Sequence, residues 1–121
     1  MGTPDSRRAR PLDRSVAHVI QRFCFVKLHD HHVEGRGDFA VRLRALFAEA
    51  GADALIGLPA DDSAAKWDVS IAITAASGEA WHALAKTPKM IEIFDDITAH
   101  AKVMKQWTFE VGGDDADSDN P

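Results

Sequence analysis

The chain has 121 residues and a formal net charge of −5, with apolar and charged fractions that are ordinary for a globular protein. This length suits one domain with its own core and is too short for two. The charges form no basic face that could follow a phosphate backbone, so we expect no nucleic-acid partner. Nowhere do about 18 apolar residues follow one another, so we expect no membrane-spanning segment and no membrane partner.

The two ends of the chain differ in composition from the middle. Both are polar and charged and lack an apolar repeat, which predicts disorder in residues 1–15 and in the acidic tail, residues 112–121. Residues 16–111 then form one folded domain. The twin arginine Arg7-Arg8 is not followed by an apolar segment, so no export signal is expected. The single cysteine, Cys24, cannot form an internal disulfide, which predicts a reducing, cytoplasmic setting.

The first half of the domain predicts a strand, a helix and a second strand. Residues 19–28, VIQRFCFVKL, are rich in β-branched and aromatic side chains and predict the first strand, and the HDHHVEGRG that follows is typical of a loop. A helix is expected from an N-cap at Asp38 to a stop at Gly51, because its apolar residues recur on one helical face. Residues 54–58, ALIGL, predict a short strand that Pro59 ends.

The second half predicts a strand, a broken helix and a last strand. Apolar and more polar residues alternate in residues 67–75, WDVSIAITA, which is typical of a strand with one buried face. That face is expected to carry Trp67, Val69, Ile71 and Ile73. Ser77 is predicted to cap the next helix, and Thr87-Pro88 to start it again. An apolar stripe continues along this last helix through Ala101 and Met104. Residues 106–111, QWTFEV, predict the final strand.

This order of elements, βαββαβ, predicts an α+β fold of the ferredoxin-like kind, with helices on one face of a four-stranded antiparallel sheet. The first strand nevertheless has apolar side chains on both faces. Phe23 and Phe25 point to one face and Cys24, Val26 and Leu28 to the other. The face without helices would expose a large apolar patch. We therefore predict a homodimer in which two copies pack sheet against sheet about a two-fold axis.

Residues 66–97, KWDVSIAITAASGEAWHALAKTPKMIEIFDDI, resemble the stress-responsive A/B barrel domain (Dabb) family, a branch of the dimeric α+β barrel superfamily. The resemblance rests on Trp67-Asp68 at the start of an aliphatic strand, on Ser77 and Thr87-Pro88 at the helix starts, and on the closing WTFEV. It implies a homodimer whose two sheets form a barrel with the helices outside. In a plant polyketide cyclase class of this family, histidines line a pocket between sheet and helices. The corresponding positions of this chain hold Arg22, Val69, Thr87 and Met90.

Two classes of function are open at this stage. The first is a small homodimeric A/B barrel protein of unassigned activity that binds a small apolar or aromatic molecule between sheet and helices. The second is a cofactor-free enzyme of the wider superfamily, a monooxygenase or a polyketide cyclase/isomerase-like enzyme. Such an enzyme needs a proton donor or acceptor in its pocket, and the sequence offers Arg22 and His18. Neither class requires a cofactor, and we expect none.

The candidate ligand-binding residues are Arg22, Trp67, Asp68, Trp81 and Met90. Arg22 lies in a strand among apolar neighbours, where a buried guanidinium needs an anionic partner. That partner is either a carboxylate such as Asp68, in a structural ion pair that we favour, or an acidic or carbonyl ligand. Trp81 lies on the inward face of its helix. Met90 belongs to the apolar stripe of the last helix, and methionine also lines ligand pockets.

The LHDHH segment, residues 28–32, holds half of the histidines of the chain. His29 and His31 alternate onto one side and are the candidates for binding a divalent ion, with Asp30 or a symmetry-related copy. No second group of ligands has a matching spacing, and Gly35 and Gly37 loosen the loop. We therefore expect a solvated polar loop and no metal site. His82 and His100 are expected to face solvent.

Overall fold

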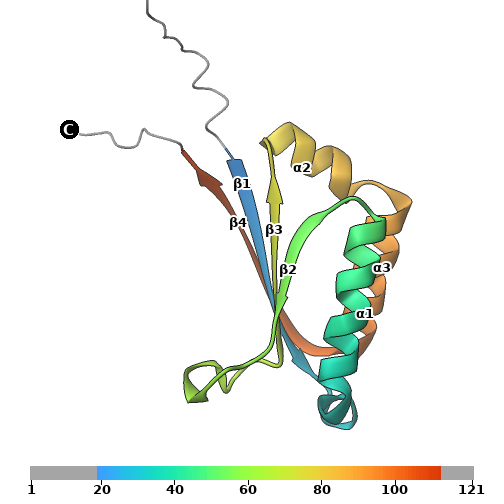
Figure 1. Ribbon diagram of the computed structural model, residues 1–121, viewed down its shortest axis with the longest axis vertical. Helices are drawn as coiled ribbons and strands as arrows, with labels where there is room; N and C mark the ends of the chain where they lie inside the picture. Colours follow the sequence, from blue (N-terminus) through green and yellow to red (C-terminus); the bar gives the residue numbers. More distant parts are fainter. Residues whose placement is uncertain (1–18, 113–121) are drawn as a thin grey trace, which may run out of the picture.

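The structure is a computed structural model that describes residues 19–112. The two predicted end segments, residues 1–15 and, apart from Gly112, residues 112–121, lie outside the described residues, as does His18. The described part of the chain is one four-stranded antiparallel sheet with three α-helices on one face (Figure 1). The α+β, ferredoxin-like arrangement expected from the sequence is therefore confirmed. No helix within residues 19–112 combines the length and the apolar character needed to cross a membrane.

The elements follow the predicted order. They are β1 (Val19–Leu28), α1 (Arg36–Glu49), β2 (Asp53–Gly57), β3 (Val69–Ala75), α2 (Gly78–Ala85), α3 (Pro88–His100) and β4 (Ala101–Val111). Two short 3₁₀ helices, η2 (Asp30–Gly35) and η3 (Asp62–Ala64), lie in the connections. The strand order is β2-β3-β1-β4, and every neighbouring pair is antiparallel. β1 and β3 are thus the central strands, which agrees with their apolar sequences.

Local side-chain chemistry sets several helix ends. The Ser77 hydroxyl accepts a hydrogen bond from the Ala80 N–H at 3.0 Å, and the Thr87 hydroxyl accepts one from the Met90 N–H at 3.4 Å. Pro88 is the first residue of α3, where its missing N–H costs nothing. Gly51 follows α1 with a φ of 76°, a left-handed conformation that glycine adopts without strain. The predicted starts of α2 and α3 and the predicted end of α1 are confirmed.

The start of α1 was predicted wrongly. Residues 30–35 form η2 and lead directly into α1, which begins at Arg36 with Gly35 as its N-cap rather than Asp38. The segment predicted as a loop is therefore mostly helical. Its glycines do not break it, because neither Gly35 nor Gly37 needs a positive φ.

The end of α3 was also predicted wrongly. The helix ends at His100, and Ala101 and Met104 belong to β4, which is longer than the predicted strand over residues 106–111. Met104 still packs against the core from the strand. Ala101 and Met104 continue the helical spacing of the apolar stripe, but they fit an alternating strand equally well. Their apolar side chains therefore could not mark where the helix ends and the strand begins.

The core lies between the helices and the inner face of the sheet. Leu43 and Phe47 of α1 and Ile93 and Ile97 of α3 are buried there against the sheet residues Val26, Leu28, Val69, Ile71 and Ile73. Cys24 is buried on the same face. Burial raises the pKa of its thiol to about 11, although the nearby positive charge of Arg22 acts in the opposite direction.

No α-helix of residues 19–112 covers the outer face of the sheet (Figure 1). Aromatic side chains contact one another on this face. Phe23 lies opposite Trp107 in the β1–β4 register and stacks edge-on with Phe109 at 5.7 Å between ring centroids. Phe25 contacts Trp107 at 5.6 Å and Trp67 at 5.8 Å. Trp107 and Phe109 remain 43% and 53% exposed. The predicted division of β1 into two apolar faces is confirmed.

Trp67 lies on this outer side, which corrects its predicted place beside Val69. β3 begins at Val69, not at residue 67, so Trp67 precedes the strand and is not bound by its alternation. Its ring contacts Phe25, whose side chain points away from the helices.

Candidate functional site

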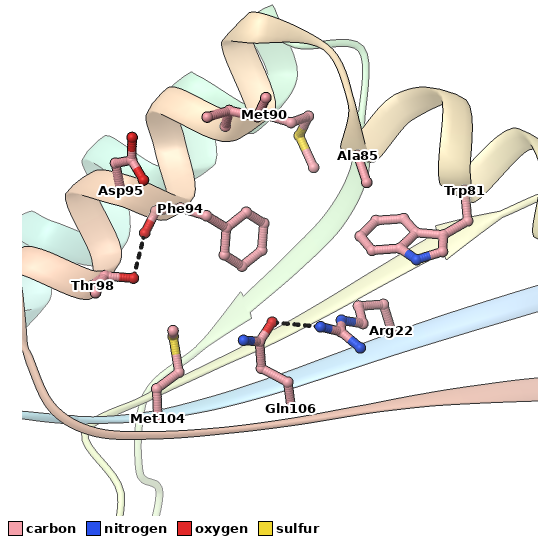
Figure 2. A pocket seen from close by; sticks show the side chains of 10 residues that line it. Arg22, Trp81, Ala85, Met90, Phe94, Asp95, Thr98, Met104 and Gln106 are labelled. Atoms are coloured by element: carbon pink, nitrogen blue, oxygen red, sulfur yellow. Dashed lines mark hydrogen bonds between the residues drawn. The ribbon is translucent and has the colours of Figure 1, made fainter.

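A cavity of about 310 Å³ lies between the helices α2 and α3 and the inner face of β1 and β4 (Figure 2). Its apolar walls come from both layers and include Trp81, Ala85, Met90, Phe94 and Met104. Its polar wall is formed by Arg22 and Gln106 of the sheet, with Asp95 and Thr98 on α3. A cavity with mainly apolar walls and a few polar groups on one side has the size and composition of a small-molecule site.

Arg22 is held in place by two neutral side chains. Its Nη1 donates to the Thr108 hydroxyl at 2.6 Å, and its Nη2 donates to Oε1 of Gln106 at 2.8 Å (Figure 2). The guanidinium carbon lies 5.7 Å from the centroid of the Trp81 ring, within cation–π range. The third donor, Nε–H, is buried and has no hydrogen-bond partner within residues 19–112.

The β1–β4 pairing brings these partners together. Arg22 lies opposite Thr108 and Cys24 lies opposite Gln106, so the four side chains share the inner face of the sheet. Lys105, Trp107 and Phe109, which alternate with Gln106 and Thr108, point to the outer face instead. A polar stretch on the inner side of an edge strand therefore provides partners for an arginine that is 84 residues and more away in sequence.

The predicted ion pair between Arg22 and Asp68 is wrong. Asp68 accepts a hydrogen bond from the Leu28 N–H at 2.9 Å and one from Nη1 of Arg36 at 3.0 Å. Its side chain is 8% exposed and lies where β1 ends, whereas Arg22 lies at the other end of the strand. Asp68 thus joins β3, the end of β1 and the start of α1, which is a structural task.

The structure brings three of the five candidate ligand residues together. Arg22, Trp81 and Met90 line the cavity. Asp68 and Trp67 do not: Asp68 is buried at the end of β1, and Trp67 lies on the outer face beside a depression of about 90 Å³. The two residues that carried the family resemblance most clearly are therefore outside the cavity.

Sequence analysis missed Gln106 and Thr108 as neighbours of Arg22, and Phe94 as part of the cavity wall. The alternation in KQWTFEV contained a signal, since it places Gln106 and Thr108 on the side opposite Trp107 and Phe109. That signal indicated an inner face with polar groups, which is unusual beside an apolar core. Phe94 was assigned to the apolar core stripe of the last helix. It lines the cavity because the cavity lies between α2, α3 and the sheet.

The electrostatics of the polar wall favour an anion. A guanidinium only donates hydrogen bonds, so Gln106 must turn its carbonyl oxygen to Arg22, which leaves the amide NH₂ as a donor at the cavity. Within residues 19–112, no carboxylate forms an ion pair with Arg22. The wall therefore holds a guanidinium that is not ion-paired within residues 19–112, a donor on Arg22 without an acceptor among them, and one carboxylate, Asp95, on the α3 side.

The histidines were only partly predicted correctly. His82 is exposed, as expected, but the His100 side chain is only 24% exposed and packs against Phe39 and His32. His29 and His31 stack with ring centroids 5.9 Å apart. Within residues 19–112, no group of three or more histidine, cysteine or acidic side chains has a metal-binding arrangement. The proposed divalent-ion role of His29 and His31 therefore gains no third ligand there.

Comparison with known proteins shows the fold. No family model matches the chain, and no curated protein matches it. Among solved structures, a hydroxynitrile lyase from Passiflora edulis is similar with a TM-score of 0.68 and 10% identity, over 81% of this chain and 97% of that one. A dimeric ferredoxin-like protein of unknown function from Thermobifida fusca has a TM-score of 0.65 and 9% identity, over 78% and 92%. Another from Jannaschia sp. has a TM-score of 0.63 and 14% identity, over 77% and 99%.

These identities establish a ferredoxin-like fold and nothing finer. Two of the three neighbours are described as dimeric, so self-association of this chain is plausible on structural grounds. The protein is thus of the ferredoxin-like α+β class, with a cavity between its sheet and its helices.

Proposed function

We propose that the protein is a homodimer of the stress-responsive A/B barrel kind that binds a small anionic molecule with an apolar or aromatic body. The observation that carries this proposal is the state of Arg22. Arg22 forms no ion pair within residues 19–112, its Nε–H has no acceptor among them, and its guanidinium belongs to the polar wall of a mainly apolar cavity. A ligand carboxylate at this wall would pair with the guanidinium and neutralise its charge.

The remaining walls fit the body of such a ligand. Trp81 covers the guanidinium from α2, while Met90 and Phe94 approach from α3. Methionine and aromatic walls adapt to flat apolar groups at little cost. Benzoate is therefore a suitable probe, with benzyl alcohol as an uncharged molecule of similar shape.

The test is a binding titration followed by NMR or calorimetry. Benzoate should bind more tightly than benzyl alcohol by about tenfold or more, which corresponds to one charge-assisted contact of about 1.4 kcal/mol or more. Arg22→Met should remove this preference. Arg44→Met is the matched control, because Arg44 is exposed and its guanidinium bonds the Ile56 carbonyl away from the cavity. Equal affinity for both probes, or an unchanged preference in Arg22→Met, would refute the proposal.

Binding is proposed rather than catalysis because the cavity wall offers few groups that could transfer a proton. Its ionisable side chains are Arg22, which is hydrogen-bonded to the neutral side chains of Thr108 and Gln106, and Asp95, an exposed residue of α3. The cofactor-free enzyme would need Asp95 as its proton acceptor. Release of a product from a bound aromatic acid, abolished by Asp95→Asn, would support that second function in place of simple binding.

The homodimer is proposed on the outer face of the sheet. The aromatic side chains there expose large apolar areas, and a second copy would cover them. Trp107→Lys should shift the molar mass measured by light scattering from dimer to monomer. Val41→Lys provides the control, because Val41 is 60% exposed on α1, away from that face. A wild-type monomer at micromolar concentration, or a dimer that survives Trp107→Lys and is lost with Val41→Lys, would refute this interface.

A further inference from the structure

Four histidine rings contact one another in a row at one end of the molecule, with the first pair stacked and the next two pairs tilted at 43° and 45°. The ring centroids of His29 and His31 lie 5.9 Å apart, those of His31 and His32 4.1 Å, and those of His32 and His100 4.3 Å. The ring of Phe39 closes the stack at 4.8 Å from His100 and nearly parallel to it. We call His29, His31, His32 and His100 the histidine stack. Three of them are neighbours in sequence, whereas His100 arrives from the end of α3.

The histidine stack joins three elements. His29 directly follows β1, and its N–H donates to the His100 carbonyl at 3.1 Å, where α3 ends and β4 begins. The His32 N–H donates to the His29 carbonyl at 2.8 Å and so fixes the first turn of η2. Phe39 belongs to α1. Contact between the rings therefore holds the end of α3 against η2 and α1.

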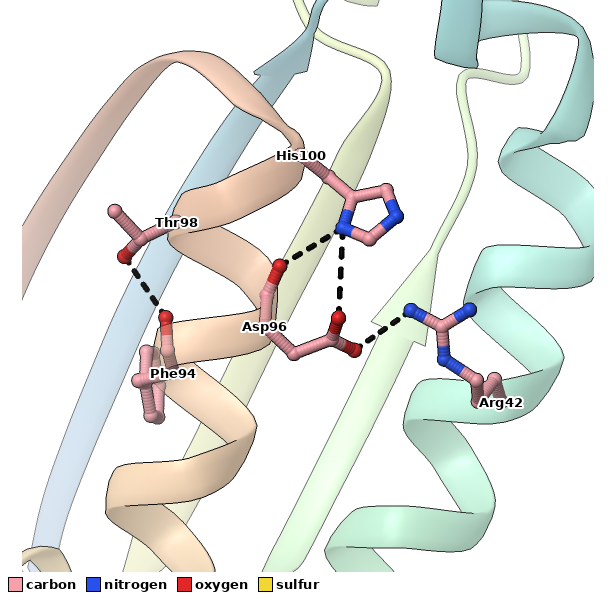
Figure 3. Close-up of polar contacts among 5 residues, drawn as sticks. All are labelled: Arg42, Phe94, Asp96, Thr98 and His100. Carbon is pink, nitrogen blue, oxygen red and sulfur yellow. Dashed lines mark hydrogen bonds and ion pairs between the residues drawn. The ribbon is translucent and has the colours of Figure 1, made fainter.

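Charged groups surround the stack unevenly. On α3, Asp96 forms an ion pair with Arg42 of α1, with 2.6 Å between its Oδ2 and the Arg42 Nη2. Its Oδ1 lies 3.5 Å from Nδ1 of His100 (Figure 3). The Asp96 carboxylate is thus already paired with the Arg42 guanidinium when His100 is neutral. The charged residues nearest the stack in sequence on these elements are Asp30 and Glu34 on η2, Arg36 and Asp38 on α1, and Lys102 on β4.

These carboxylates do not provide a partner for every imidazole. Arg36 is paired with Asp68, and Asp38 lines a small cavity of about 200 Å³ together with Arg42 and the rings of His31, His32 and His100. Asp30 and Glu34 are exposed on η2. His32 lies between His31 and His100 in the stack, so it has an imidazole on either side.

The tautomer of His100 is determined by its backbone contact. Its Nδ1 lies 2.9 Å from the Asp96 carbonyl oxygen, which only accepts, so Nδ1 must carry a proton (Figure 3). Oδ1 of Asp96 lies 3.5 Å from the same Nδ1. His32 has no such carboxylate contact among the described residues, and it would meet the charges of its neighbours.

Neutral imidazoles stack favourably, whereas adjacent imidazolium ions repel one another at these distances. The direction of the effect is clearest for His32. Loss of hydration lowers its pKa below the usual 6.5, and the charges of His31, His100 and His29 lower it further. The folded protein then binds protons at His32 less readily than the unfolded chain does. The contribution of His32 to stability is complete above pH 6.5 and is lost as the pH falls below it.

We propose that the histidine stack is an acid-sensitive clasp that holds the end of α3 against η2 and α1 when its rings are neutral and releases it when they become charged. The clasp does not depend on a ligand in the cavity or on the dimer. Its action is local, because the stack touches η2, α1 and the α3–β4 junction and leaves the β2–β3 side of the sheet untouched.

Hydrogen exchange of single amides tests the clasp directly. The His29 N–H is the reporter, because its bond to the His100 carbonyl must break when the clasp opens. Its protection factor, corrected for intrinsic exchange, should fall several-fold between about pH 7.5 and 5.5, because the open state binds protons at His32 more readily than the closed state does. The Ala52 N–H, bonded to the Phe47 carbonyl at the far end of α1, is the internal control and should change little.

Two variants separate the stack from general acid effects. His32→Gln removes the middle ring and should make the His29 protection nearly independent of pH over this range. His82→Gln removes an exposed histidine of α2 and should leave the wild-type dependence unchanged. A ¹H–¹³C NMR titration of the wild-type protein needs no variant: the His32 ring should titrate below the ordinary histidine pKa of 6.5. Titration of His32 at or above 6.5, or the same pH dependence in His32→Gln as in wild type, would overturn the proposal.

Discussion

Replacement of Asp68 tests whether this residue holds the fold together or binds a ligand. Its carboxylate accepts from the buried Leu28 N–H at 2.9 Å and from the Arg36 guanidinium at 3.0 Å. In Asp68→Ala, the Leu28 N–H stays buried without an acceptor, which costs about 1–3 kcal/mol. The Arg36 side chain is 40% exposed, so its ion pair adds only about 0.2–1 kcal/mol. We expect the free energy of unfolding to fall by about 2–3 kcal/mol.

Two companion variants divide this loss into its parts. Asp68→Asn keeps an oxygen that can accept from the Leu28 N–H, so its loss should be smaller, about 1 kcal/mol. Arg36→Met removes only the partly exposed ion pair and should cost about 1 kcal/mol or less. Urea denaturation at one fixed protein concentration measures all three, because a dimer makes the midpoint depend on concentration.

The result that would refute this reasoning is specific. A loss below about 0.5 kcal/mol in Asp68→Ala would show that the Leu28 N–H finds another acceptor, since an orphaned buried donor costs more than that. An equal loss in Asp68→Asn and Asp68→Ala would show that the ion pair, not the backbone contact, carries the energy. Benzoate binding should be unchanged in Asp68→Asn, because Asp68 does not line the cavity.

Three further predictions concern single positions. Thr87→Ala removes the N-cap of α3 and should lower the free energy of unfolding by about 1 kcal/mol in urea denaturation, with Thr98→Ala as an exposed threonine control. Gly51→Ala places a side chain at a φ of 76° and should also cost about 1 kcal/mol, seen as a lower melting temperature; an unchanged value would mean that the backbone relaxes. Cys24 should react slowly with a thiol reagent at pH 8, because burial raises its pKa from 9.0 to about 11. Stability from the protonated thiol is complete below pH 9.0 and is lost as the pH rises through about 11, a dependence that Cys24→Ala should remove.

The parts of the fold that could be predicted from the sequence depend on neighbours in the chain. Ser77 and Thr87-Pro88 mark helix starts because an N-cap bonds an N–H three residues away. Phe23 and Cys24 define the two faces of β1 because side chains alternate along a strand. Each of these signals is complete within a few residues, so no knowledge of the rest of the molecule is needed.

The candidate site could be predicted only in part for the opposite reason. Arg22 was recognised as a residue that needs a partner, but Gln106 and Thr108 lie 84 and 86 residues later in the chain, and the β1–β4 register selects them. A carboxylate partner was the reasonable expectation from the cost of burial alone. Because Gln106 and Thr108 are neutral, they do not neutralise the positive charge of Arg22. That charge is the reason for proposing an anionic ligand.

By itself, the sequence determined the order of the elements, the apolar inner faces and the need of Arg22 for a partner, because periodicity, capping and the cost of burying charge act locally. Only the tertiary structure decided which side chains meet. It placed Asp68 with Arg36, brought His100 to the histidines of residues 29–32, and ended α3 at His100 although Met104 continued the stripe. These outcomes depend on how the sheet and helices pack. Packing brings together residues that are far apart in the chain, and no local sequence pattern indicates which of them will be in contact.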